Sequence, residues 1–250
     1  MARVFITGSA DGLGQLAARS LTKQGHRVVL HARNAGRAQV ALDAVPDAEA
    51  VVIGDLSRSE ETQQLAAEVN ALGRFDAVIH NAGVYQASGP DLFAVNTLAP
   101  YVLTCLIQKP QRLIYISSGM HLQGDASLSP ITTGKGRIRY ADSKLYVVLL
   151  AKAIARHWPD VFVNAVDPGW VPTKMGGRGA PDDLDQGVET QVWLAVSGDS
   201  DAQVSGRYLF HKRVARDHPA TDQPAFQDAF LAVCEQFTGV RLGPGTTQDA

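Results

Sequence analysis

Short apolar runs alternate with amphipathic stretches along almost the whole chain, and this alternation limits the possible folds more than any other feature of the sequence. Runs without a polar residue at every second position are typical of strands that helices cover on both faces of a sheet. Seven such runs are expected to be strands: 4–6, 28–30, 50–53, 75–79, 113–116, 161–166 and 208–210. Six helices are expected between them, near 13–21, 34–44, 57–72, 91–108, 138–157 and 184–197. The order predicts an α/β fold with a seven-stranded, mainly parallel sheet and helices on both faces.

The composition excludes several other classes of protein. Lys and Arg (23) nearly balance Asp and Glu (25), so there is no electrostatic reason to expect nucleic acid or an anionic membrane as a partner. The longest apolar run, 145–151, is far shorter than the ~20 residues of a membrane span, and no signal peptide is expected at the start. Cys105 and Cys234 lie in apolar helical patterns and are expected to be reduced thiols. We expect a cytoplasmic protein with a single domain over 1–250.

A glycine-rich turn lies between the first predicted strand and the first predicted helix. Glycine lets the backbone approach a pyrophosphate, and the start of a helix offers free N–H groups and the positive end of a dipole. The turn therefore predicts the phosphate-binding loop of a doubly wound, Rossmann-type fold, although a turn that merely packs has the same composition. The residues expected to bind a dinucleotide here are Gly8, Ser9, Asp11, Gly12, Leu13 and Gly14.

The end of the second predicted strand indicates which dinucleotide binds. A carboxylate at this position favours NAD, whereas an arginine accommodates the 2′-phosphate of NADP. The strand ends without a carboxylate and is followed by Arg33 and Asn34, which we expect to contact NADP. Asp11 argues in the other direction, because its charge would repel the phosphate, and a solvated surface arginine is the alternative for Arg33. We predict NADP as the cofactor and keep NAD open.

Tyr140 and Lys144 stand four residues apart at the start of a predicted helix, so their side chains share one face. A neighbouring ammonium is expected to lower the pKa of the phenol, which would make Tyr140 a proton donor or acceptor near neutral pH. An ordinary exposed pair has the same spacing.

When these motifs are taken together, the chain resembles the short-chain dehydrogenase/reductase superfamily in its compact single-domain form. Residues 7–14 are similar to the T-G-x-x-x-G-x-G loop of the family, and 168–173 to its P-G-x-V-x-T segment. The resemblance implies a catalytic set of Asn96, Ser118, Tyr140 and Lys144. It also implies cofactor contacts from Asp55, Leu56, Asn81, Ala82, Gly83, Tyr140, Lys144, Pro168, Gly169, Val171 and Thr173.

The resemblance also implies a role for each catalytic residue. Ser118 would bind the carbonyl oxygen and Tyr140 would transfer the proton. Lys144 would bind the nicotinamide ribose and tune the tyrosine, and Asn96 would hold a water that links Lys144 to solvent. The implied reaction is hydride transfer between NADP and a carbonyl or alcohol.

An interval of 22 residues separates Ser118 from Tyr140, and Ser117-Ser118-Gly119-Met120-His121 precedes a long connection over 119–137. These features are similar to the retinol-dehydrogenase-like and WW-domain-oxidoreductase-like branch, which implies a small to medium, lipophilic substrate. The stretch 174–183 is expected to be a second loop at the ligand edge of the sheet. Tyr85, Trp170 and Met175 are expected to flank the pocket unless they pack in the core.

Other readings remain open from the sequence. His121 either touches the substrate or orders its loop, and His31, His157 and His218 are interpreted as surface or packing residues. No metal site is expected, and no G-x-S-x-G elbow makes a serine a hydrolase nucleophile. A regulatory protein that binds the cofactor without turnover is the alternative function. A sugar-nucleotide epimerase would need more than the about forty residues after Phe210. A homodimer or homotetramer through 91–108 and 138–157 is expected unless these helices face only the sheet.

Overall fold

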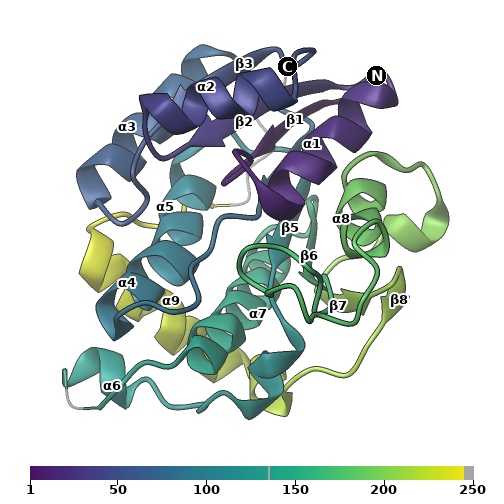
Figure 1. Ribbon diagram of the computed structural model, residues 1–250. Helices are drawn as coiled ribbons and strands as arrows, with labels where there is room; N and C mark the ends of the chain where they lie inside the picture. Colours follow the sequence, from purple (N-terminus) through teal and green to yellow (C-terminus); the bar gives the residue numbers. More distant parts are fainter. Residues whose placement is uncertain (135, 245–250) are drawn as a thin grey trace.

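One sheet runs through the molecule, in the strand order β3-β2-β1-β4-β5-β6-β7-β8 (Figure 1). The computed structural model describes residues 1–134 and 136–244. Every neighbouring pair of strands is parallel except β7 and β8. The strands are β1 (Arg3–Ile6), β2 (Arg27–Ala32), β3 (Ala50–Ile53), β4 (Ala77–His80), β5 (Arg112–Ile116), β6 (Phe162–Asp167), β7 (Arg207–Phe210) and β8 (Arg213–Val214). The predicted α/β fold with a mainly parallel sheet is confirmed.

The direction of strand addition reverses at β1. From β1 the chain adds β2 and β3 on one side and then returns to add β4 on the other, so that Phe5 pairs with Val29 and also with Val78. In open α/β sheets a ligand binds beside the carboxyl ends of the strands at such a reversal. The loops that follow β1 and β4 are therefore the first place to look for a site.

Helices cover both faces of the sheet. On one side lie α1 (Gly12–Lys23), α2 (Ala35–Ala44) and α8 (Gln186–Val196), and on the other α3 (Ser59–Ala71), α5 (Ala99–Leu106) and α7 (Tyr140–His157). The sheet separates two apolar clusters. Val4 and Ile6 belong to the cluster under α1, and Phe5 belongs to the opposite one, because successive side chains of a strand point to opposite faces. Unbroken apolar strands thus follow from a sheet that is buried on both sides.

The sheet has eight strands where seven were predicted. The additional strand, β8, is two residues long and pairs antiparallel with β7. A tight turn joins the two strands, with His211 and Lys212 at positive φ (47° and 61°). Neither residue is the Gly, Asn or Asp typical of a two-residue hairpin turn, and β8 has no apolar run, so the sequence contains no hairpin signal here.

The helix predicted over 91–108 is interrupted in its middle. It consists of α4 (Gly89–Phe93), the π-helical turn η1 (Ala94–Leu98) and α5. Pro100 has no N–H to donate to the carbonyl of Asn96, so the regular helical ladder cannot continue through Asn96. Single π-helical turns occur frequently at functional sites.

The chain after β7 adds a helix that was not among the six predicted. Helix α9 (Pro224–Thr238) packs against the outer side of α7, where Phe230 stacks on Tyr146 with ring centroids 5.6 Å apart. Phe237 meets Phe93 of α4, and the residues after α9 reach α5, because the Tyr101 hydroxyl donates to the carbonyl of Val240 (2.8 Å). Cys234 is buried in this helix and Cys105 is half-buried in α5, and both are free.

The connections also contain short helical turns. The predicted loop 119–137 includes η2 (Gly119–Gln123) and α6 (Ser129–Thr132), and the other turns are η3 (Ser200–Ala202) and η4 (Pro219–Asp222). None of the helices in the described part of the chain has the length and hydropathy that a membrane span requires.

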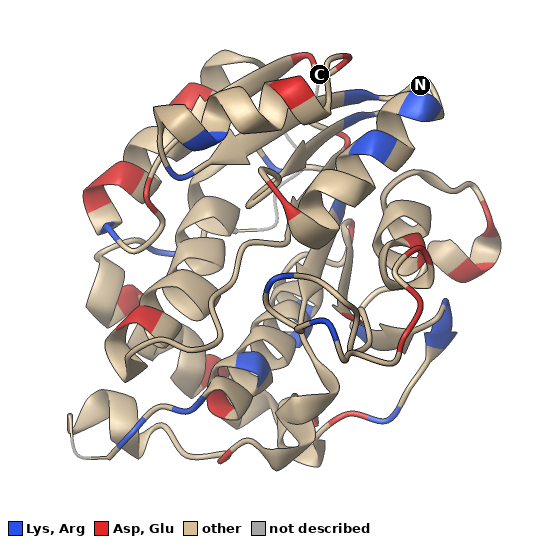
Figure 2. Ribbon diagram, viewed as in Figure 1, with Lys and Arg blue, Asp and Glu red and all other residues tan. Residues whose placement is uncertain are grey.

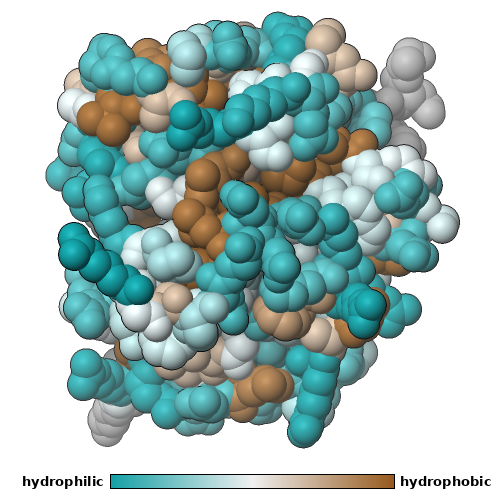
Figure 3. Space-filling view, turned by 45° about the vertical axis from the view of Figure 1, so that its right-hand side comes forward, coloured by the Kyte–Doolittle hydropathy of each residue, from teal (hydrophilic) through white to brown (hydrophobic). Residues whose placement is uncertain are grey.

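The surface is mixed in charge but not uniform in polarity. Basic and acidic residues are interspersed over the helices and loops (Figure 2). Apolar residues gather in a hollow at the centre of one face, and hydrophilic side chains surround it (Figure 3). An apolar hollow with a polar border is the usual form of a small-molecule site.

Candidate active site

The glycine loop is held against the end of β4 by Thr7 and Asn81. The Thr7 hydroxyl accepts hydrogen bonds from the N–H groups of Asn81 and Ala82, each at 3.0 Å. In return, the Asn81 amide donates to the carbonyls of Thr7 and Gly8, also at 3.0 Å. A Cβ on Gly14 would lie 2.5 Å from the Gly8 carbonyl oxygen, so glycine is required there for close approach.

The start of α1 forms an anion cradle. The side chain of Asp11, at the N-cap position, makes no capping hydrogen bond. Among the described residues, the N–H groups of Gly12, Leu13 and Gly14 have no hydrogen-bond acceptor. Gly12 has a positive φ of 54°, which exposes the backbone beside Thr173. Free N–H groups at the positive end of a helix dipole fit the pyrophosphate of a dinucleotide.

His31 connects the glycine loop to the loop after β3. The N–H of Gly8 donates to Nδ1 of the imidazole (2.9 Å), and Nε2 lies 2.9 Å from the carbonyl of Gly54. An N–H donor on one nitrogen and a carbonyl on the other require the neutral tautomer with its proton on Nε2. Burial lowers the pKa of His31, which favours this neutral form. His31 is therefore not a surface residue, and its packing organises the candidate cofactor loop.

Asp11 does not stand as an uncompensated negative charge in the glycine loop. It forms ion pairs with Arg37 of α2 and with Lys174, which lies 3.3 Å away in the loop after β6. Arg33 is exposed beside this group, and its charge also acts on Asp55. Asn34 caps α2, where its Oδ1 accepts from the N–H of Arg37 (3.0 Å). The basic side chains near the end of β2, Arg33, Arg37 and Lys174, thus outnumber the carboxylate of Asp11.

The loop after β3 lies at the same edge of the sheet. Asp55 accepts hydrogen bonds from the N–H (3.0 Å) and hydroxyl (2.7 Å) of Ser57, and Leu56 is buried beside it. Burial opposes ionisation of Asp55, but these hydrogen bonds and the nearby arginines hold its pKa below the usual value. The charged carboxylate of Asp55 suits contact with a polar edge of a bound ring, and the buried side chain of Leu56 suits contact with an apolar edge of the same ring.

Tyr140, Ser118 and Lys144 come together where β5 ends and α7 begins. Nζ of Lys144 lies 5.5 Å from the centre of the Tyr140 ring and donates to the carbonyl of Ile116 (2.8 Å). Ser118 lies near the Tyr140 phenol and acts to lower its pKa, and its Oγ accepts from the N–H of Met120 (3.3 Å). The other serine of the pair, Ser117, is buried and donates to the carbonyl of Lys144 (2.9 Å). Of the two serines, Ser118 is the one beside the phenol.

The surroundings of Tyr140 act on its pKa in the direction opposite to the prediction. Burial raises the pKa of Tyr140, the charge of Asp167 raises it further, and Ser118 lowers it only in part. Burial also lowers the pKa of Lys144 to about 8, against the opposing effect of Asp167. The expected lowering of the Tyr140 pKa by Lys144 fails because desolvation of the phenolate is the larger effect.

Asn96 is buried in η1, and its amide is nearly saturated. Its Oδ1 accepts from the N–H of Val84 (2.8 Å), and its Nδ2 donates to the carbonyl of Val84 and the hydroxyl of Ser143, each at 3.0 Å. A Cβ on Gly83 would come within 3.4 Å of both Oδ1 of Asn96 and Nζ of Lys144. Asn96 and Lys144 therefore border one small space beside Gly83.

The segment after β6 brings its own backbone to the site. The N–H of Gly169, whose φ is 79°, donates to Asp167 (3.0 Å), so the chain turns sharply after Pro168. Val171 is buried, and Thr173 lies against Gly12 with its methyl group. The segment thus faces the glycine loop across the reversal point of the sheet.

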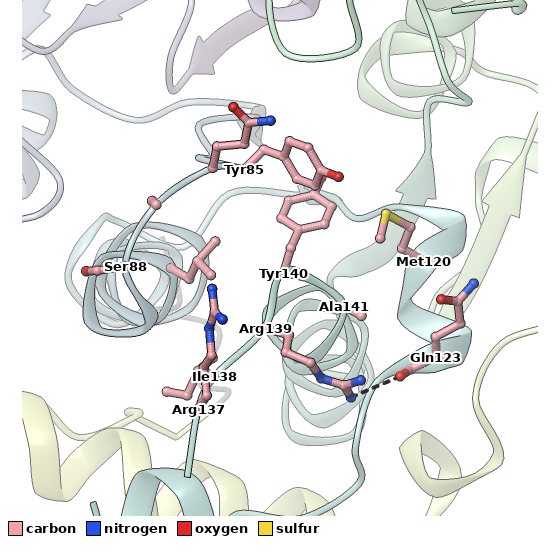
Figure 4. A pocket seen from close by; sticks show the side chains of 12 residues that line it. Tyr85, Ser88, Met120, Gln123, Arg137, Ile138, Arg139, Tyr140 and Ala141 are labelled. Carbon is pink, nitrogen blue, oxygen red and sulfur yellow. Dashed lines mark hydrogen bonds between the residues drawn. The ribbon is translucent and has the colours of Figure 1, made fainter.

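A cavity of about 600 Å³ opens at Tyr140 (Figure 4). Tyr85 meets the Tyr140 ring edge-on, with centroids 4.8 Å apart, and Met120 of η2 lies on the opposite wall. Leu92 and Ile138 supply further apolar surface, and the cavity has the size of a pocket for a small to medium molecule.

Comparison with known proteins agrees with this geometry. The sequence model of the short chain dehydrogenase family matches residues 2–183. An uncharacterized oxidoreductase of Emericella nidulans is 46% identical, and the match covers 98% of this chain and 100% of that protein. The chain belongs to the short-chain dehydrogenase family. The predicted family and the predicted activity as an oxidoreductase are thereby confirmed.

Two further similarities extend this result. The short-chain dehydrogenase chyC of Penicillium rubens is 41% identical over 97% of this chain and 99% of its own length. A crystal structure of a blue fluorescent protein from a metagenomic library, in complex with NADPH, has a TM-score of 0.70. It is 20% identical and covers 84% of this chain and 95% of its own, which shows a shared fold.

The remaining residues predicted for this short-chain dehydrogenase differ in their burial and in their contacts. His121 is fully buried, its Nδ1 lies 2.8 Å from the carbonyl of Ser118, and its ring packs on Tyr208 at 4.3 Å. These contacts favour the loop-ordering alternative. Trp170 and Met175 are exposed in the loop after β6, and His157 is exposed at the end of α7. His218 is half-buried and caps η4.

Sequence reasoning did not single out Arg37, Lys174 or Asp167. Two of them could have been found from neighbouring residues: Arg37 stands four residues after Arg33, and Asp167 directly precedes the Pro168-Gly169 motif. Lys174 contacts a residue far away in the chain, and no local pattern indicates that pair. Within the described residues, no cluster of His, Cys, Asp and Glu side chains could hold a metal ion.

Proposed function

We propose that this short-chain dehydrogenase transfers a hydride between NADPH and a carbonyl compound, with the alcohol as the other partner of the reaction. The observation that carries the proposal is the convergence of Ser118 and Lys144 on Tyr140, which in turn lines a cavity of about 600 Å³. A phenol, a hydroxyl and an ammonium are the groups that a developing alkoxide requires.

Each catalytic residue has a distinct role in this proposal. The bound nicotinamide supplies or accepts the hydride. Ser118 and Tyr140 donate hydrogen bonds to the carbonyl oxygen, and Tyr140 gives its proton to the oxygen as negative charge develops there. Lys144 remains largely protonated at neutral pH with a pKa of about 8, and its charge stabilises the phenolate that is left behind.

The raised pKa of Tyr140 suits the reducing direction. A phenol that stays protonated throughout the neutral range is ready to act as an acid whenever a substrate binds. Asn96 is proposed to support resupply of the proton through water. Pro100 leaves the Asn96 carbonyl without its usual helical donor, which makes that oxygen the candidate acceptor for such a water.

Cofactor contacts are proposed at the carboxyl ends of the strands, on both sides of the reversal at β1. The free N–H groups of residues 12–14 fit the pyrophosphate. Arg33 and Arg37 are suited to the 2′-phosphate of NADP, and the charge of Asp11 is balanced by Lys174 as well as by Arg37. NADP is therefore the preferred cofactor, with NAD as the second possibility. The other proposed contacts are Gly8, Ser9, Asn34, Asp55, Leu56, Asn81, Ala82, Gly83, Pro168, Gly169, Val171 and Thr173.

A panel of aldehydes and ketones, followed by the loss of NADPH absorbance, tests the reaction. We expect turnover with at least one small or medium lipophilic carbonyl, and none above background for Tyr140→Phe. NADPH binding by Tyr140→Phe should stay within about twofold of the parent, since the lost hydroxyl belongs to the chemistry. Binding of NADPH without turnover of any carbonyl would favour the alternative of a regulatory protein.

The cellular location and the oligomeric state of the protein are also proposals. The two free thiols, Cys105 and Cys234, suit the reducing cytoplasm. A dimer or tetramer through α5 and α7 would have to form where α9 already packs on α7 and where Val240 binds Tyr101. We therefore propose that the protein acts as a monomer.

A further inference from the structure

The cavity at Tyr140 is lined by two arginines and, in the described structure, by no carboxylate. The two cations are in different situations. Arg139 forms an ion pair with Asp142 (2.6 Å), and its Nη2 also donates to the carbonyl of Gln123 (3.1 Å). Arg137 is exposed and has no hydrogen bond or ion pair with any described residue. The charge of Arg139 is thus compensated within the protein, and that of Arg137 is not.

The side chain of Arg137 points into the cavity. Figure 4 shows its guanidinium between Ser88 and the Tyr140 ring, whereas Arg139 turns away toward Gln123. An arginine on an open surface would be surrounded by water alone. Here the same wall carries the apolar side chains of Ile138 and Leu92, both buried, so that apolar groups lie beside the guanidinium.

A guanidinium presents parallel N–H donors that match the two oxygens of a carboxylate. The cavity therefore offers a proton donor at Tyr140 and an anion partner at Arg137, with apolar surface between them. We propose that the substrate is a carbonyl compound that also carries a carboxylate, held by Arg137 while its carbonyl oxygen meets Ser118 and Tyr140. This inference rests on the proposed function and makes its lipophilic substrate amphipathic.

Matched pairs of benzaldehydes test the inference. The probes are 3- and 4-carboxybenzaldehyde and the corresponding neutral carboxamides, each reduced with NADPH by the parent protein and its variants. We expect the parent to prefer a carboxylate over its amide by about 10-fold or more in kcat/KM, the range of one charge-assisted hydrogen bond. Arg137→Gln should bring the two values within about twofold of each other, and Arg137→Lys should keep part of the preference.

Arg74→Gln is the control, because it removes the same charge from an exposed residue before β4, at the opposite edge of the sheet. It should leave the preference unchanged. Isothermal titration of the NADPH complex with benzoate and benzamide gives a second readout that needs no turnover, and tighter binding of benzoate should disappear in Arg137→Gln.

The outcomes separate the two proposals. Reduction of the amides and carboxylates at equal rates, or a carboxylate preference that survives Arg137→Gln, would overturn the inference and leave the proposed function intact. Equal binding of benzoate and benzamide would overturn it as well. Failure of every aldehyde in the wider panel to be reduced would instead refute the proposed function, and the inference would fall with it.

Discussion

The backbone N–H of Gly8 donates a hydrogen bond to Nδ1 of His31 across 23 residues of sequence, at a distance of 2.9 Å. The other nitrogen of the same ring lies 2.9 Å from the carbonyl of Gly54, in the loop that precedes Asp55. One buried imidazole thus connects the proposed pyrophosphate loop to the loop of Asp55 and Leu56, two proposed cofactor contacts. This side chain thereby helps to fix the relative positions of the two loops.

Loss of this connection should weaken cofactor binding without slowing the chemistry. His31→Ala is expected to raise KM for NADPH by about 10-fold with kcat within about twofold, because two hydrogen bonds of about 1 kcal/mol each are lost far from Tyr140. His31→Asn retains an acceptor for Gly8 and should recover part of the effect. His26→Ala is the control, since His26 accepts a similar bond from the N–H of Ala2 (3.0 Å). Steady-state kinetics decide the matter, and an equal change in His26→Ala would contradict a role specific to the loop.

Three buried histidines should make stability depend on pH well above the range of carboxylates. Burial lowers the pKa of His31 and His121, and lowers that of His80 to about 3. The unfolded chain, with histidine pKa values near 6.5, then binds more protons than the folded chain. The free energy of unfolding should therefore fall as the pH drops below about 6.5, by up to about 1.4 kcal/mol per pH unit for each histidine.

Urea unfolding at pH 7 and pH 5 measures this dependence. The stability of the parent should decrease between the two values, and it should decrease less in His31→Asn and less in His80→Asn. Identical pH dependence in the parent and both variants would mean that other groups are responsible. The depressed pKa values of Glu49, Asp55 and Asp142 begin to matter only at lower pH, where their unfolded forms start to bind protons.

The two neighbouring serines should respond in opposite ways to the loss of their hydroxyls. Ser118→Ala is expected to lower kcat by about 10²- to 10³-fold, because it removes a donor to the developing oxyanion, and to cost at most about 1 kcal/mol of stability, because its Oγ accepts from the N–H of Met120 (3.3 Å). Ser117→Ala should keep kcat within a fewfold and lower the free energy of unfolding by about 1 kcal/mol, because Ser117 donates to the carbonyl of Lys144. Kinetics and urea unfolding of both variants test the assignment. A larger loss of kcat in Ser117→Ala would reverse it.

The preference for NADP should depend on Arg33. Arg33→Ala is expected to raise KM for NADPH by about 10-fold or more and to leave KM for NADH nearly unchanged, since only NADPH carries a 2′-phosphate. Arg58→Ala is the matched control: Arg58 also acts on Asp55 but pairs with Glu61 (2.8 Å). If KM for NADPH is unchanged in Arg33→Ala, this arginine is a solvated surface residue and the cofactor assignment loses its main support.

The parts of the site that were predictable are those that the chain holds together locally. Tyr140 and Lys144 lie one helical turn apart, and residues 8–14 form one loop that leads into α1, so local spacing together with the neighbouring motifs predicted their chemistry. Fold class followed from unbroken apolar strands such as 113–116. In each case the physical constraint acts between residues that are close in sequence.

The parts that escaped prediction depend on contacts between distant residues. Asp11 looked unfavourable for NADP because its partner Lys174 is 163 residues away. The pKa of Tyr140 follows from burial and from Asp167 on β6, neither of which the motif around Tyr140 records. The break in the predicted helix 91–108 could have been anticipated from Pro100, whereas the turn before β8 lacks the Gly, Asn or Asp that would indicate a hairpin.

The proposed monomer gives a last prediction, because α9 occupies the face on which two copies were expected to meet. Phe230 is fully buried against Tyr146, so the contact belongs to the core and a partner subunit would have to displace it. Light scattering coupled to gel filtration should give a mass near 26.7 kDa at micromolar concentration. Phe230→Ala should lower the free energy of unfolding by about 3 kcal/mol, whereas Phe237→Ala, half-exposed at the end of α9, should cost much less. A parent protein of twice that mass would contradict the proposed monomer.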